Sequence, residues 1–298
     1  MDNFYQATEA TTRNQRTQMS YQAALTRHRT YRGLTRISWV TWLIALGTIL
    51  IWCYTAYQTA LAAGAHTIHD IFANIINNAI NVQPGEDNVL TTVLITYGAK
   101  DNELIIHGQY WRFITPIFLH ANLLHIALNM FNFAVLGVFL ERIAGHLRFL
   151  LIYLLAGVFS VITSFYFAPH DISVGASGAI FGLVGAYSIF VLIHRRAFRR
   201  GGIPTLLWIA IVIALNLSIG FFIQNVDNYA HVGGLLSGCI LGWLFMPLYR
   251  EIPSAHQPYS YILTDMHSLS RRWYLAVLTI LCTLVLAILA LHLNGTRS

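Results

Sequence analysis

Long apolar runs alternate with short polar connections along this chain. Seven runs are each close to the ~20 residues that a helix needs to cross the hydrocarbon core of a bilayer. They cover residues 37–60, 117–140, 147–167, 177–193, 203–223, 229–248 and 273–293. The pattern therefore predicts an all-α fold, a polytopic membrane helix bundle.

The polar stretches divide the chain into four parts. Residues 1–36 form a basic N-terminal arm, which has no apolar run of signal-peptide type. Residues 37–250 hold six runs and are predicted to form the membrane core, residues 251–272 a linker, and residues 273–298 a seventh membrane helix with a short tail.

The first connection contains a segment of a different kind. Its apolar residues follow helical spacing, with asparagines on the opposite side. The apolar set is Ile68, Ile71, Phe72, Ile75, Ile76 and Ala79, and the polar set is Asn74, Asn77, Asn78 and Asn81. Such two-faced spacing predicts a helix that lies in the membrane interface.

Composition supports a membrane protein over a soluble one. Hydrophobic residues make up 56% of the chain and charged residues 10%, against about 25% charged in a soluble domain. The cysteines Cys53, Cys239 and Cys282 all fall inside apolar runs, so neither a disulfide framework nor a zinc site is indicated.

Basic residues predict the orientation. Of the 18 lysines and arginines, 15 lie on alternate connections, and Lys100, Arg112 and Arg297 lie on the other side. The positive-inside rule then places the N-terminus in the cytoplasm and the C-terminus outside. The net charge of +6 is accounted for by topology and attraction to the lipid bilayer, so no nucleic-acid partner is expected. Compact loops and short tails favour a bacterial cell membrane.

Two apolar runs begin with a reactive side chain beside regularly spaced glycines. Ser177 is followed by Gly178 and Gly182, and His231 precedes Gly234 and Gly238. Small residues four apart let two helix backbones approach closely. Both runs cross from outside to inside, so the serine and the histidine lie at one depth, where the imidazole can activate the hydroxyl as a nucleophile.

The second run places further polar residues at that depth. His125 and Asn129 are four residues apart and share a helix face, whereas His120 need not share it. Imidazole and amide N–H groups, with the N–H groups at the helix start of Ser177, suit a developing oxyanion.

Other hydrolytic chemistries lack their residues. The chain has no His-Glu-x-x-His and no carboxylate in the middle of a run, which argues against zinc and aspartyl proteolysis. A metal on His120 and His125 lacks a third ligand nearby. No metal and no cofactor is therefore expected.

Four separated motifs resemble the rhomboid intramembrane serine proteases across residues 37–250. They are Gly175-Ala176-Ser177-Gly178, Ala230-His231 with Gly234 and Gly238, His120-x₄-His125-x₃-Asn129, and the Trp111-Arg112 pair. The resemblance implies a six-helix core, with the run at 273–293 as an additional C-terminal helix.

The resemblance also implies roles for individual residues. Ser177 is the expected nucleophile and His231 the general base. His125, Asn129 and the Ser177 N–H are the expected oxyanion donors, with His120 supporting the site. Trp111 and Arg112 would belong to a first-loop structure partly in the outer leaflet, with a lipid-interface anchor and a phosphate-facing charge as alternatives. Phe181 replaces a tyrosine common in relatives; its ring can still stack on the imidazole.

The leading hypothesis is thus an intramembrane serine endopeptidase that cleaves transmembrane protein substrates near their outer ends. A transporter would need polar residues along a whole path, whereas these cluster at one level. A non-catalytic rhomboid-like protein that binds membrane clients typically lacks the serine or the histidine. The sequence gives no oligomeric state.

Overall fold

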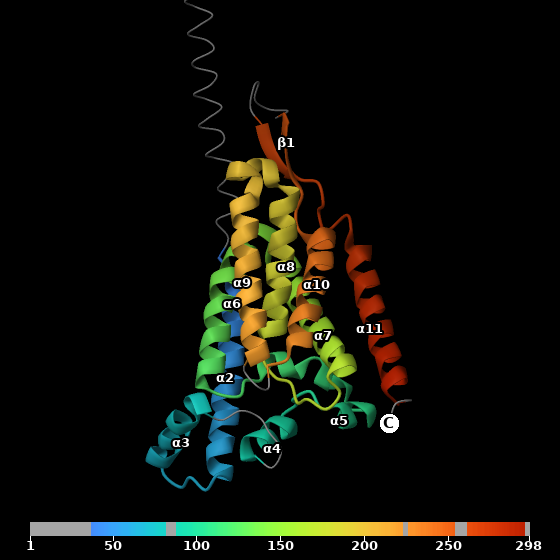
Figure 1. Cartoon of the computed structure of the whole chain (residues 1–298). Coiled ribbons are helices and arrows are strands. Elements are labelled where there is room, and N and C mark those ends of the chain that lie inside the picture. Colours follow the sequence, from blue (N-terminus) through green and yellow to red (C-terminus); the bar gives the residue numbers. More distant parts are fainter. Residues whose placement is uncertain (1–36, 82–87, 223–225, 254–260, 296–298) are drawn as a thin grey trace, which may run out of the picture.

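The computed structural model describes residues 37–81, 88–222, 226–253 and 261–295, so the predicted N-terminal arm lies outside the described residues. Within these ranges, seven long helices stand where the apolar runs lie. They are α2 (Trp39–Ala62), α6 (Leu123–Ala144), α7 (His146–Phe167), α8 (Ser177–Ile193), α9 (Ile203–Phe222), α10 (Asn228–Phe245) and α11 (Trp273–Gly295). They run alongside one another in a bundle, as predicted (Figure 1).

Length and hydropathy fit a multi-pass membrane protein. Among the described helices, α2, α6, α7 and α11 are long and apolar enough to cross a membrane by these criteria alone. α8 has 17 residues and is shorter. Leucine, isoleucine and tryptophan side chains are widely exposed on the outside of the bundle, where lipid tails would cover them.

The second spanning helix begins later than the sequence pattern predicts. The expected start was residue 117, but α6 begins at Leu123. Pro116 lies in the short 3₁₀ helix η3 (Thr115–Phe118), and the Asn122 side chain caps α6 by accepting a hydrogen bond from the His125 N–H at 2.8 Å. His120 therefore lies on the chain before α6 and not in its first turn.

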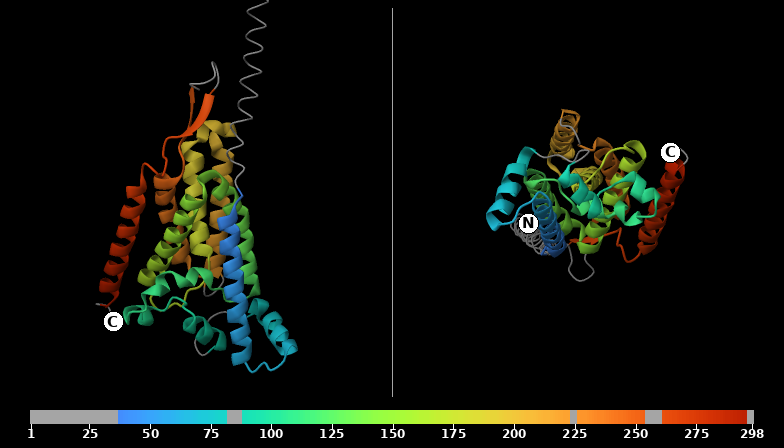
Figure 2. Two further views of the ribbon diagram at one scale, coloured as in Figure 1. Left: turned by 180° about the vertical axis from the view of Figure 1, so that it is seen from behind. Right: turned by 90° about the horizontal axis from the view of Figure 1, so that it is seen from below.

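The described residues of the first connection, 63–81 and 88–122, form short helices at one end of the bundle. They are α3 (Ile68–Asn81), α4 (Val89–Thr96), α5 (Asn102–Ile106), η2 (Tyr110–Phe113) and η3. Figures 1 and 2 show them gathered at this end, which we call the connection end. α3 confirms the predicted helix and exposes Ile68, Phe72 and Ile76. These apolar side chains suit the membrane interface.

Close backbone contact between α8 and α10 forms the centre of the bundle, as the glycine spacing predicts. A Cβ atom on Gly238 would lie 2.0 Å from the carbonyl oxygen of Gly182, and one on Gly234 would lie 2.0 Å from that of Gly178. Such distances exclude any side chain at these positions. The helices that carry Ser177 and His231 are thereby fixed against each other.

A β-hairpin at the opposite end is the main departure from an all-helical chain among the described residues. β1 (Tyr249–Pro253) pairs antiparallel with β2 (Tyr261–Asp265). β1 begins two residues before the predicted linker, residues 251–272, for which no strand was expected. We call this the hairpin end.

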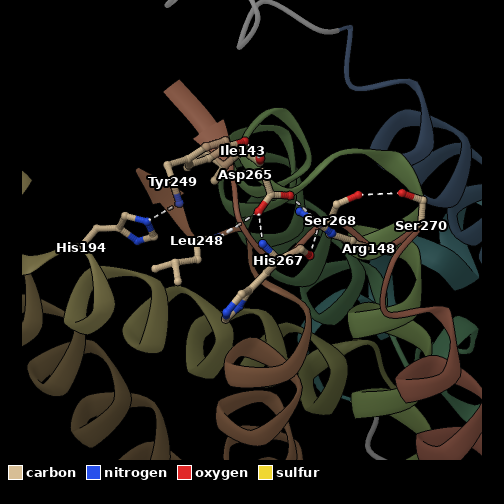
Figure 3. A network of polar contacts seen from close by, with 9 residues as sticks. All are labelled: Ile143, Arg148, His194, Leu248, Tyr249, Asp265, His267, Ser268 and Ser270. Carbon is tan, nitrogen blue, oxygen red and sulfur yellow. Dashed lines mark hydrogen bonds and ion pairs between the residues drawn. The ribbon is translucent and has the colours of Figure 1, made fainter. Parts of the chain in front are cut away.

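Polar contacts attach the hairpin to the helices (Figure 3). The Asp265 carboxylate accepts hydrogen bonds from the Arg148 guanidinium at 2.6 Å and from the Leu248 N–H at 3.1 Å. The Tyr249 hydroxyl donates to the Ile143 carbonyl at 2.9 Å, and the Tyr249 N–H donates to His194 Nε2 at 3.1 Å. The hairpin therefore joins the ends of α6, α7, α8 and α10.

Candidate active site

Ser177 is the first residue of α8, at the connection end. The first N–H groups of a helix have no partner within it, and the helix dipole is positive there. Gly175 precedes it with φ of 126°, a conformation that residues with a side chain rarely adopt. The chain thus turns sharply and presents Ser177 at the start of the helix.

His231 lies in the first turn of α10 and meets this serine. Its Nε2 atom is 2.8 Å from Ser177 Oγ, and the residue is 8% exposed. The Phe181 ring stacks on the imidazole with centroids 4.6 Å apart and planes 18° apart. Nδ1 has no hydrogen-bond partner among the described residues. Stacking, rather than a carboxylate, therefore orients this imidazole.

His125 and Gly175 border the space beside the Ser177 hydroxyl. A Cβ atom on Gly175 would lie 2.8 Å from His125 Nε2 and 3.8 Å from Ser177 Oγ. The Ala121 N–H donates to His125 Nδ1 at 3.5 Å, which leaves Nε2 to carry the proton in the neutral ring. An N–H donor consequently faces the gap that the glycine leaves open.

Asn129 follows one turn later on α6, and its amide already has a partner. Asn129 Nδ2 donates to the carbonyl of His125 at 2.9 Å. An amide nitrogen carries two hydrogens, so one is used within the helix and the other remains to donate.

His120 lies behind the loop that leads to Ser177. It is 1% exposed, and its Nε2 accepts a hydrogen bond from the Ala176 N–H at 3.3 Å. Its ring centroid is 5.0 Å from that of His125. No cluster of three or more metal-binding side chains occurs in the part of the chain that the structure describes. The contact with the Ala176 N–H joins His120 to the residue just before Ser177.

Trp111 and Arg112 differ in exposure. Trp111 is 54% exposed, which suits an interface anchor, but Arg112 is buried. Its guanidinium donates to the Ala99 carbonyl and to Gln109 Oε1, each at 2.8 Å. The alternative of a phosphate-facing arginine is therefore wrong, because the side chain is buried inside the first connection and only 3% exposed.

The remaining glycines bring helices together around the site. Gly178 faces Ser160 of α7, whose Oγ would lie 2.2 Å from an added Cβ, while Gly234 and Gly238 face α8 as described above. Each allows a neighbouring helix to approach where a side chain would keep it away.

Two capping residues at the site were not predicted. Asn122 caps α6 beside His125, and Asp227 caps α10 by accepting a hydrogen bond from the Ala230 N–H at 2.9 Å. Both stand three residues before the residue whose N–H they bind. Asn or Asp at that offset before an apolar run is a signal available from the sequence.

Together, the fold and this site define a multi-pass helical membrane protein with a partly buried serine–histidine contact at the start of two tightly packed helices. Comparisons with known proteins agree with this class. A Rhomboid domain matches residues 107–248. The rhomboid protease GluP of Bacillus subtilis is 44% identical over 53% of this chain and 30% of its own length.

Plant relatives match over a longer span. RHOMBOID-like protein 6, mitochondrial, of Arabidopsis thaliana is 34% identical over 74% of this chain and 73% of its own length. RHOMBOID-like protein 5 is 31% identical over 78% of this chain and 77% of its own length. The chain belongs to the rhomboid family and is a homologue of rhomboid proteases. It spans less than a third of GluP but about three quarters of these plant relatives.

Proposed function

We propose that this protein is an intramembrane serine endopeptidase that uses Ser177 as nucleophile and His231 as general base. The observation that carries the proposal is the 2.8 Å contact between Ser177 Oγ and His231 Nε2 at the starts of α8 and α10. An unassisted serine hydroxyl is a poor nucleophile at neutral pH, and an imidazole at hydrogen-bond distance removes that limitation.

The reaction follows from this contact. Ser177 Oγ bonds to the scissile carbonyl carbon while its proton passes to His231 Nε2. The tetrahedral intermediate collapses, the C–N bond breaks, and His231 gives its proton to the leaving amine. Water then attacks the acyl-enzyme with His231 as base, and Ser177 recovers its proton when the ester bond breaks.

The oxyanion of each intermediate needs fixed donors. We assign this role to the Ser177 N–H, His125 Nε2 and the second hydrogen of the Asn129 amide. The position of His125 Nε2 beside the gap at Gly175 supports the assignment. No metal or cofactor takes part in it.

Transmembrane proteins are the proposed substrates, cut near the outer face of the membrane. The arginines at the hairpin end support a cytoplasmic location for that end, which puts the site and the C-terminus outside. A bacterial cell membrane is the proposed location.

The first prediction tests the nucleophile with a fluorophosphonate probe and a panel of single-pass membrane proteins. Ser177→Ala removes one oxygen from a helix start where alanine is well tolerated, so the protein should fold and lose both labelling and cleavage. His231→Ala should suppress both as well.

Ser237→Ala is the matched control, because this α10 hydroxyl donates only to backbone carbonyls of its own helix, at 2.7 and 3.0 Å. It should keep near-normal activity. Cleavage by purified Ser177→Ala protein would contradict the protease proposal and favour a client-binding protein.

A further inference from the structure

Lys100 is the only lysine in the chain, since the other 17 of the 18 basic residues are arginines. It lies in the first connection between α4 and α5, and its exposed fraction is 0%. A buried ammonium group is costly unless it is paired and hydrogen-bonded. The groups that bind the Lys100 ammonium therefore indicate which part of the chain this residue holds in place.

Main-chain and side-chain atoms of Lys100 both bind the loop that leads to Ser177. Lys100 Nζ donates to the carbonyl of Ala168 and, at 2.8 Å, to that of Asp171. The Lys100 N–H donates to the Ser173 carbonyl at 3.0 Å, and the Ser173 N–H donates back at 3.4 Å. One residue thus holds residues 168–173, the segment just before Gly175 and Ser177.

Charge links the same amine to the helix of His231. Asp227 caps α10 through one carboxylate oxygen, while the other is buried without a hydrogen-bond partner among the described residues. The carboxylates of Asp227, Asp171 and Asp101 all favour the ammonium form of Lys100. These carboxylates therefore attract the ammonium group electrostatically, while its hydrogen bonds go to the carbonyls of Ala168 and Asp171 in the loop before α8.

We propose that Lys100 is a positioning residue, whose ammonium group fastens the first connection to the loop before Ser177 and so keeps the serine hydroxyl within reach of His231. The inference rests on the proposed function of these two residues. A positioning lysine differs from a lysine that only stabilises the fold. Removing the charge of a positioning lysine should lower the reactivity of Ser177 even where the protein remains folded.

The pH dependence supplies a test on the unaltered protein. Burial lowers the pKa of the Lys100 amine from its usual 10.5 to about 8, although the three aspartates act to raise it. Between these two values the folded protein binds fewer protons at this amine than the unfolded chain does, so this group makes stability rise with pH. Charge-assisted hydrogen bonds weaken when the amine becomes neutral. The reactivity of the Ser177 hydroxyl should therefore fall as the pH rises through about 8, while the Tm does not fall over the same range.

The experiment measures fluorophosphonate labelling of Ser177 in purified full-length protein against pH, together with the Tm. Lysine labelled with ¹³C at Cε gives one resonance, because there is one lysine, and its titration reports the amine directly. We expect the inactivation rate kinact to fall with the same apparent pKa as this resonance, while the binding constant Ki stays constant.

Lys100→Met should lower kinact roughly 10–100-fold, in the range expected for a misplacement of about 1 Å, and should abolish the fall above pH 8. Asn102→Leu is the matched control. Asn102 is buried on the same connection, and its amide donates to the Phe165 carbonyl of α7 at 2.8 Å and not to residues 168–173. It should lower the Tm yet keep kinact and its pH profile.

Two outcomes would overturn the inference about Lys100 while leaving the proposed function intact. In the first, labelling requires Ser177 but has the same kinact in Lys100→Met as in the wild type. In the second, the lysine resonance titrates with a different pKa from kinact. Proteolysis that does not need Ser177 would overturn the proposed function and the inference together. The wild-type titration needs no variant, so it decides the question even if Lys100→Met does not fold.

Discussion

At the scale of single residues, the site depends on a position where a side chain is missing. The space beside the hydroxyl of Ser177 exists because residue 175 is glycine, and His125 faces it. Glycine also permits the φ of 126° that turns the chain into α8. Glycine at position 175 thus allows the backbone to turn and also leaves the space beside Ser177 open.

The oxyanion donors give the prediction at this scale. His125→Ala and Asn129→Ala should each lower kcat, by about 10²–10³-fold if each acts like a single donor in a soluble protease. Substrate binding should change much less, because the donors act on charge that develops in the transition state. Steady-state kinetics on a cleaved substrate separate the two effects. Full turnover in the double variant would remove α6 from the mechanism.

The reactive side chains were the part of the candidate site that the sequence predicted best. A serine and a histidine beside spaced glycines stand out in apolar runs because polar side chains are costly there. The partners of Arg112 and Lys100 did not stand out. Most of their acceptors, such as the carbonyls of Ala99 and Ala168, belong to the backbone, and backbone groups leave no trace in the identity of a residue.

At the scale of elements, the packing of α8 on α10 positions the chemistry. Periodicity revealed it, since glycines four apart align on one helix face. The hairpin was not predicted, because its strands are short and their attachment depends on distant residues, such as the Asp265 contact with Arg148. The late start of α6 was missed because the cap at Asn122 was not recognised.

Gly238→Ala tests this packing. The new Cβ would lie 2.0 Å from the Gly182 carbonyl, a backbone atom that cannot move aside alone. The helices must separate, so we expect a loss of about 1–3 kcal/mol of stability, seen as a lower Tm in detergent, with reduced activity.

Gly47→Ala provides the comparison for that variant. It is also a glycine-to-alanine change in a membrane helix, but no atom lies within 4 Å of the added Cβ on α2. Its Tm should stay equal or rise, because alanine favours the helix more than glycine does. Equal effects of both changes would argue against the contact as the cause.

At the scale of the whole molecule, the distribution of charge predicts which end faces the cytoplasm. In a background without native cysteines, Arg196→Cys near the hairpin end should resist an impermeant thiol reagent in intact cells. Glu103→Cys at the connection end should react. Both side chains are exposed, so accessibility within the protein does not explain a difference. The reverse labelling would place the site on the cytoplasmic side.

α11 is attached near both ends: the hairpin lies before it, and its Asn294 donates to the Phe165 carbonyl of α7 at 2.8 Å. It runs along one side of the bundle, opposite α3 (Figure 2). A client helix diffusing in the bilayer meets the enzyme along its perimeter, in two dimensions. The perimeter along α7 is already occupied by α11. Under the proposed function, a substrate helix must therefore approach from one of the other sides, and α11 would restrict the direction of approach without contacting Ser177 or His231.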